Sequence, residues 1–229
     1  MQSEKTTGRT VCFTGQNVKS LCGFNHDSYL YLVKQLKSTV LDMVTKMNVT
    51  RFITFGAQGF EQLVFWAVQA LRTGKIDGNK YPHVENVVML PCNNYGHNWS
   101  KTGTFGRKQL EMIKAQATSV IYNETYDKPL RRKDLTDAIK RCHVDAIAQS
   151  DMCFALSNNK TWNDPQQIVY GNVTEFMRWA YAYKKPLYQI NYDICTGDDG
   201  TKNITVAKML KYANWNEENI NQFIRYAHI

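Results

Sequence analysis

The feature of this sequence that most constrains its fold is an alternation between short apolar runs and longer segments of helical character. The apolar runs are "RTVCFT" (9–14), "RFITF" (51–55), "NVVMLP" (86–91), "TSVIYN" (118–123), "SDMCFALS" (150–157) and "PLYQIN" (186–191). The predicted helices between them are 28–47, 60–73, 106–116, 131–149 and 172–184. Because the strand-like runs are apolar throughout, both faces of their sheet should be covered. The sequence therefore predicts an α/β fold, a Rossmann-like and mostly parallel sheet with helices on both faces.

Residues 193–229 differ from the rest of the chain. A polar loop, "TGDDGTKN", precedes "VAKMLKYA" and "EENINQFIRYA", which have the spacing of short amphipathic helices. We expect a C-terminal helical appendage, 193–229, packed on a domain formed by residues 1–192. A chain of 229 residues that is 43% hydrophobic can bury a core large enough for one such domain.

Composition narrows the class of protein. No apolar run approaches the ~20 residues of a membrane span, and the polar start "MQSEKTTGRT" lacks the apolar segment of a secretory signal. We therefore expect a cytoplasmic protein without a membrane partner. The six cysteines include no C-x-x-C pair, so neither a zinc site nor a disulfide framework is expected, and no cofactor is predicted. The net charge of +8 would attract nucleic acids as well as phosphorylated small molecules.

Suggestive residues follow three of the predicted strands, and ligands of open parallel sheets bind outside these carboxyl ends. The candidate ligand-binding residues are Thr14, Gly15, Gly56, Ala57, Gly59, Glu61, Ser157, Gly171, Asn172, Thr174 and Glu175. Unpaired N–H groups at the start of a helix favour a phosphate, and glycine allows the backbone to approach a ligand closely. A carboxylate accepts hydrogen bonds from ribose or acts as a general acid or base, so Glu61 and Glu175 are also the candidate catalytic residues.

Each of these features also has a plainer interpretation. Glycine after a strand is common turn chemistry, and "GNVTE" resembles a capping box with Asn172 as the N-cap. His143 lies in a predicted helix, where a neutral structural role is favoured over catalysis. Trp99 and Trp162 lie in loops beside the expected ligand edge, where either could stack on a base or close the core.

Four stretches, taken in order, resemble the SLOG superfamily and in particular its YpsA-like branch. They are "CFTGQN", "FITFGAQGFEQLVFWAVQAL", "PCNNYGHNWS" and "AIAQSDMCFALSNN…YGNVTEFMRWAYAYKKPLYQIN", which together cover roughly residues 9–192. The resemblance implies a Rossmann-like sheet that binds nucleotides or nucleotide-derived ligands. Members of the superfamily include phosphoribohydrolases that activate cytokinins, DNA-uptake proteins, and sensors of nucleotide-like signals in conflicts between bacteria and phages.

The sequence departs from the family pattern at several positions. Glu61 stands where the branch usually has Asp, and Gly171-Asn172 replaces a double glycine. The Pro-Gly-Gly signature of the phosphoribohydrolases is absent. Cys142 occupies the place of an Arg that often precedes the Ser-Asp pair, which puts a catalytic role at that position in doubt.

These observations leave three functions open. The first is a protein that binds a nucleotide or nucleotide-derived small molecule as a sensor, carrier or sequestering protein, with the Asn-rich style of the chain favouring a phage origin. The second is a hydrolase or transferase acting on N-glycosidic bonds of nucleotides. The third, which the positive charge favours, is a single-stranded DNA-binding protein. A homo-oligomer is compatible with all three.

Overall fold

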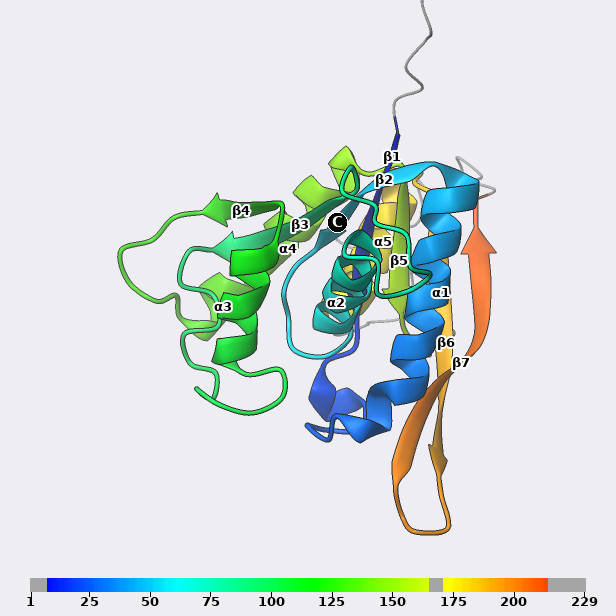
Figure 1. The fold of residues 1–229 in the computed structure, drawn as a ribbon. Helices are drawn as coiled ribbons and strands as arrows, with labels where there is room; N and C mark the ends of the chain where they lie inside the picture. Colours follow the sequence, from blue (N-terminus) through cyan, green and yellow to red (C-terminus); the bar gives the residue numbers. More distant parts are fainter. Residues whose placement is uncertain (1–7, 165–170, 214–229) are drawn as a thin grey trace, which may run out of the picture.

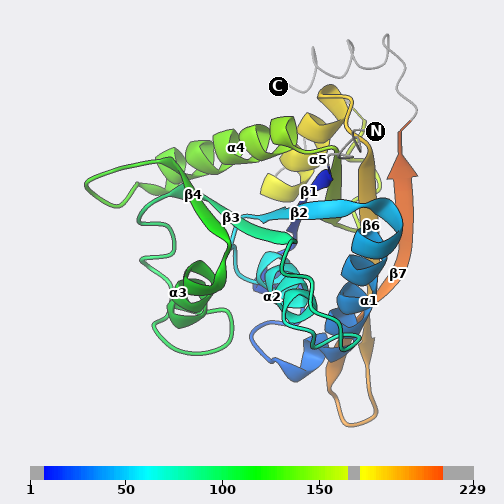
Figure 2. The ribbon, with the colours of Figure 1, turned by 45° about the horizontal axis from the view of Figure 1, so that its top comes forward.

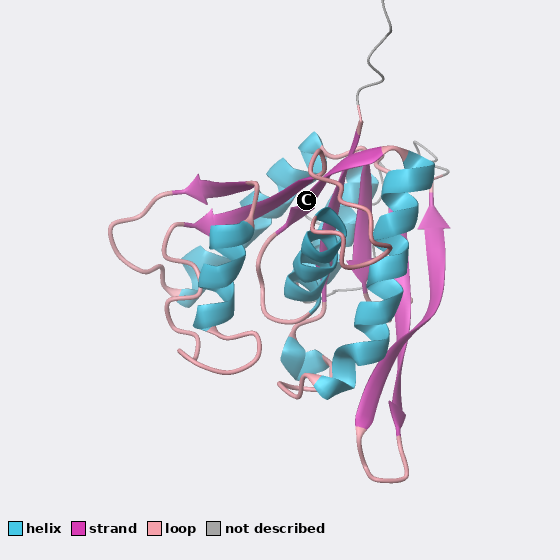
Figure 3. Cartoon of the chain, viewed as in Figure 1, coloured by secondary structure: helices cyan, strands magenta, loops and turns pink. Residues whose placement is uncertain are grey.

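The computed structural model describes residues 8–164 and 171–213, and these residues form a seven-stranded sheet in the order β4-β3-β2-β1-β5-β6-β7 (Figures 1 and 3). The strands are β1 (Arg9–Gly15), β2 (Val49–Thr54), β3 (Glu85–Cys92), β4 (Ser119–Glu124), β5 (Met152–Leu156), β6 (Leu187–Thr196) and β7 (Lys202–Tyr212). Neighbouring strands from β4 through to β6 run parallel, and β7 runs antiparallel to β6.

Helices cover both faces of this sheet, as the apolar strand runs predicted. The helices are α1 (Leu30–Met47), α2 (Phe60–Arg72), α3 (Arg107–Gln116), α4 (Arg132–Gln149) and α5 (Asn172–Ala182). Figure 2 shows α1, α2 and α3 on one side and α4 and α5 on the other. The prediction of a mostly parallel, Rossmann-like sheet between two helical layers is confirmed.

In β1 and β2, alternate residues enter different cores, which explains why these strands carry apolar residues on both faces. In β1, Val11 and Phe13 join the core beneath α1 and α2, whereas Cys12 joins the core beneath α4 and α5. In β2, Phe52 joins the core beneath α1 and α2, and Ile53 joins the core beneath α4 and α5. A strand that is buried on both sides has few positions for a polar side chain, and the buried Thr14 and Thr54 lie near the carboxyl ends of these two strands.

The strand order contains a reversal beside β1. The chain leaves β1 for β2, β3 and β4 on one side, and then returns to place β5 on the other side of β1. The loops after β1 and β5 consequently diverge toward opposite faces of the sheet, which opens a crevice at the carboxyl ends of these two strands.

The C-terminal segment differs from its prediction. Residues 202–212, expected to include an amphipathic helix, form β7, which pairs with β6 along its length. The polar loop is the hairpin turn, in which the Gly197 N–H donates to the Thr201 carbonyl over 2.8 Å. Ile204, Thr205 and Val206 are β-branched and favour an extended chain beside an available strand edge. The second expected helix, at 217–227, lies outside the described residues.

This arrangement makes β7 part of the main core. Ile204 is fully buried in the cluster that contains α1, so Ile204→Ala should lower the free energy of unfolding by about 2–4 kcal/mol. The matched control is Ile194→Ala in β6, because the Ile194 side chain is 42% exposed and should cost less than about 1 kcal/mol. Urea unfolding of both variants provides the measurement, and equal small losses would contradict the placement of β7.

Candidate functional site

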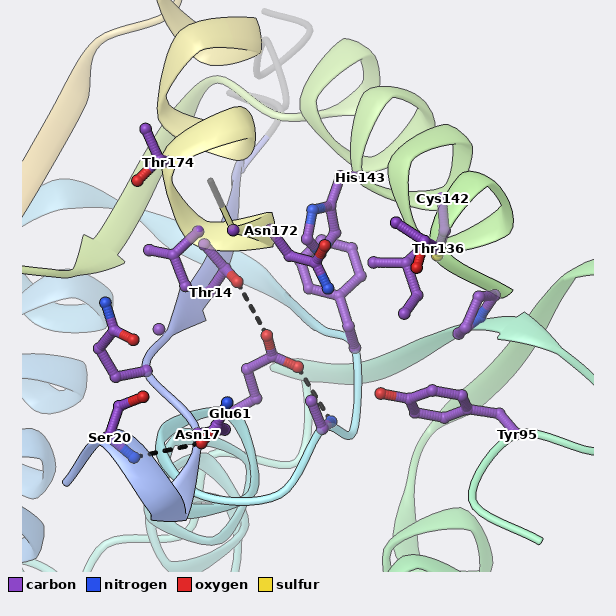
Figure 4. A pocket seen from close by; sticks show the side chains of 18 of the residues that line it. Thr14, Asn17, Ser20, Glu61, Tyr95, Thr136, Cys142, His143, Asn172 and Thr174 are labelled. Carbon is purple, nitrogen blue, oxygen red and sulfur yellow. Dashed lines mark hydrogen bonds between the residues drawn. The ribbon is translucent and has the colours of Figure 1, made fainter. Parts of the chain in front are cut away.

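A cavity of about 510 Å³ lies at the crevice beside β1. Its wall comes from the turns after β1 and β2, the loop after β3, one face of α4 and the start of α5 (Figure 4). A volume of this size falls within the roughly 300–1,000 Å³ typical of small-molecule sites. The residues that line the cavity include Thr14, Gly15, Phe55, Ala57, Glu61, Tyr95, Arg132, Cys142, His143, Gly171, Asn172 and Thr174.

The floor of the cavity is organised by the carboxylate of Glu61 in the first turn of α2. The Thr14 hydroxyl donates to its Oε1 over 2.8 Å, and the Ala57 N–H donates to its Oε2 over 3.0 Å. Figure 4 shows both bonds as dashed lines. One side chain thus ties the turn after β1 to the turn after β2.

Glu61 is only 3% exposed. Burial raises the pKa of its carboxyl from the ordinary value near 4.5 to about 7, against the opposing effect of the hydrogen bonds from Thr14 and Ala57. A carboxyl that exchanges its proton near neutral pH inside a cavity is suited to acid–base chemistry and to hydrogen bonding with hydroxyl groups.

The opposite wall contains the N-terminus of α5. Gly171 is the N-cap, with a φ of 118° that disfavours other residues, and no side chain caps the first turn. Asn172 is therefore the first helical residue and not the N-cap of a capping box. The first N–H groups of an uncapped helix are unpaired and carry a partial positive charge, and here Gly171, Asn172 and Thr174 line the cavity.

His143 of α4 forms part of the same wall. It is 4% exposed, and its ring lies against Phe55 and Phe176, with centroid distances of 4.4 and 5.4 Å. Burial lowers the pKa of the imidazole to about 3. The expected neutral histidine is therefore present, but its place in the cavity wall was not expected.

The structure brings together only part of the predicted site. Thr14, Gly15, Ala57, Glu61, Gly171, Asn172 and Thr174 line the cavity, whereas Gly56, Gly59, Ser157 and Glu175 do not.

Packing explains the two glycines that do not line the cavity. A Cβ on Gly59 would come within 3.0 Å of the Gln16 carbonyl oxygen, and one on Gly56 within 3.0 Å of Leu110. Both glycines therefore allow close approach within the protein.

Two polar residues of the predicted site have partners elsewhere. Ser157 is fully buried, and its carbonyl accepts hydrogen bonds from Gln189 and Asn191. The Glu175 carboxylate lies 3.3 Å from the Lys140 ammonium and so joins α5 to α4.

The structure also places the two tryptophans that were expected near the ligand. Trp162 is fully buried and packs on Tyr181 and Tyr212, so it closes the core. The loop that contains Trp99 contributes Tyr95 to the cavity instead, while Trp99 packs against the edge of Tyr95. Tyr95 was not predicted as a site residue, although it follows a strand in the same loop as Trp99.

The fold and the cavity define a Rossmann-like α/β protein with a small-molecule-sized pocket at its strand reversal. The sequence model of the YspA SLOG family matches residues 11–177, and the chain belongs to this family.

The chain is similar to two further proteins. The uncharacterized SPbeta prophage-derived protein YoqJ of Bacillus subtilis (strain 168) is 30% identical over 99 residues, 43% of this chain. The chain spans about half of that relative, 53% of its length. The structure of DNA processing protein A from Helicobacter pylori, described for its single-stranded DNA binding mode, matches with a TM-score of 0.45 and 15% identity. That match covers 79% of this chain and 64% of the other.

None of the helices in 8–164 and 171–213 is long and apolar enough to cross a membrane. The same residues hold no group of three or more His, Cys, Asp or Glu side chains placed to bind a metal ion.

The raised pKa of Glu61 makes stability depend on pH. The folded protein keeps this proton up to about pH 7, whereas the unfolded chain releases it near 4.5. The stabilising contribution is therefore complete below pH 4.5 and is lost as the pH rises through 7, a change of roughly 3 kcal/mol. Relative to Glu61→Gln, the wild-type protein should lose stability between pH 4.5 and 8 in urea unfolding.

The matched control is Glu175→Gln, which removes a carboxylate outside the cavity lining. It should follow the pH dependence of the wild-type protein. Parallel curves for the wild type and Glu61→Gln would contradict the assigned burial of Glu61.

Proposed function

We propose that this protein binds a nucleotide or nucleotide-derived small molecule in the cavity, as a sensor, carrier or sequestering protein. The observation that carries the proposal is the uncapped start of α5, which opens onto the cavity and faces the floor built around Glu61. A phosphate would accept hydrogen bonds from the free N–H groups of this helix. The hydroxyl groups of a ribose would then reach the Glu61 carboxylate.

Local charge supports a ligand with few phosphates. Among the described residues that line the cavity, Arg132 is the only lysine or arginine. Glu61 adds a carboxyl group that ionises near neutral pH. A polyphosphate would need more cationic partners than this. We therefore favour a nucleoside monophosphate or a similar singly phosphorylated molecule. The prophage-derived relative is consistent with a phage origin.

Glu61 also supports a second function, cleavage or transfer of an N-glycosidic bond. A buried carboxyl with a pKa of about 7 could give or take the proton that such a reaction requires. The other candidate, Glu175, is paired with Lys140 and does not line the cavity, so this function would depend on Glu61.

A single-stranded DNA-binding role draws its support from the net charge of +8. Tight binding of single strands that weakens steeply with salt would favour it over a small-molecule ligand.

Isothermal titration with nucleoside monophosphates, followed by chromatography of the mixture, separates the first two functions. Binding with the ligand recovered intact supports the sensor or carrier. Release of free base that stops in Glu61→Gln supports the enzyme. No binding and no release would refute both.

Asn172 provides a test directed at the phosphate. Asn172→Asp adds a negative charge at the first position of α5, where it should stabilise the helix by about 0.3–1 kcal/mol and repel an anionic ligand. We expect unchanged or higher thermal stability together with nucleotide affinity at least ~10-fold weaker. Asn172→Ala is the control for loss of the amide and should weaken binding less. Equal affinities of the two variants would place the phosphate elsewhere.

A further inference from the structure

We propose that His143 is the residue that selects the base of the bound nucleotide, at an aromatic end of the cavity formed with Phe55 and Tyr95. This inference rests on the proposed function and adds to it the orientation of the ligand and the group that determines specificity. The phosphate would lie at the start of α5, and the base would lie next to it, against α4.

The position of His143 supports this assignment. Its ring is 4% exposed and lines the cavity, and Figure 4 shows it directed from α4 toward the space beside Asn172. The Phe55 and Phe176 rings hold it in place. Within 8–164 and 171–213, no residue forms a hydrogen bond with its ring nitrogens. The ring nitrogens are not among the fully buried side-chain atoms that lack a partner, so they keep access to the open cavity, where a ligand could supply one.

The chemistry of the ring matches the edge of a base. A neutral imidazole carries one N–H donor and one acceptor nitrogen, and burial keeps His143 neutral throughout the physiological pH range. The hydrogen bond that it offers is therefore fixed by its tautomer and does not change sign with pH. A site that presents a buried donor or acceptor strongly rejects ligands that leave it unpaired.

The surroundings of His143 complete a site for a flat, apolar ring. Phe55 and Tyr95 line the cavity near it, and Cys142 and Ile139 contribute further apolar surface from α4. Figure 4 shows the Tyr95 hydroxyl directed into the cavity, toward the side on which Glu61 lies. Polar groups are present on this side as well, because Arg132 and Thr136 of α4 also line the cavity. Apolar rings next to polar groups suit a molecule that combines a flat base with a sugar phosphate.

The test compares AMP, GMP, CMP and UMP with ribose 5-phosphate, which lacks a base. Dissociation constants are measured by titration calorimetry for the wild type, His143→Phe, His143→Gln and the control His83→Phe, whose histidine is an exposed loop residue. His143→Phe keeps an aromatic ring between Phe55 and Phe176 but removes both nitrogens. His143→Gln restores a group that both donates and accepts. Thermal melting confirms that each variant is folded.

We expect the wild type to prefer one nucleotide by ~10-fold or more, and His143→Phe to lose most of that preference. Affinity for ribose 5-phosphate should stay within about twofold of the wild type, and His143→Gln should recover part of the preference. His83→Phe should behave as the wild type.

Two results would overturn the inference while leaving the proposed function intact. One is a wild type that binds all four nucleotides no more tightly than ribose 5-phosphate. The other is an equal loss for every ligand in His143→Phe, which would assign the ring a structural role. Failure of the wild type to bind any of the five probes would overturn the proposed function and this inference together.

Discussion

The buried carboxylate of Glu61 is the interaction on which the site depends. Parallel strands leave their carboxyl-end turns independent of one another, and here a single side chain connects two of them through Thr14 and Ala57. The connection is formed in a place where ionisation is costly, which raises the pKa of the carboxyl to about 7. The Glu61 carboxyl thus both joins the two turns that form the floor of the cavity and can exchange a proton near neutral pH.

The rest of the cavity follows from topology. The strand β5 pairs with β1 on the side opposite β2. The helices before and after β5, which are α4 and α5, therefore lie beside the turn that follows β1. The helix α4 contributes aromatic and apolar surface through His143 and Cys142, and α5 contributes an uncapped N-terminus at Gly171. In the proposed function, the parts of the cavity that would bind the phosphate and the base therefore come from neighbouring helices on one face of the sheet.

The sequence predicted the order of strands and helices because apolar runs buried on both faces are distinctive. It did not predict β7, whose helix-like spacing was overridden by the exposed edge of β6. Among the predicted site residues, Thr14, Ala57, Glu61 and Gly171 line the cavity, because they end strands or begin helices. Gly59 does not line the cavity, and the sequence does not reveal that the Gln16 carbonyl occupies the space beside it. The cavity positions of His143 and Tyr95 depend on side-chain direction, which a single sequence does not encode locally.

The most direct measurement is amide chemical-shift mapping of the protein during titration with AMP, GMP, CMP and UMP. A nucleotide bound as proposed should shift the backbone N–H signals of Asn172, Val173 and Thr174 most strongly, together with those of Gly15 and Ala57, in a saturable manner. Saturable shifts confined to residues outside the cavity, or no shifts with any of the four nucleotides, would contradict the assignment of this cavity as the ligand site.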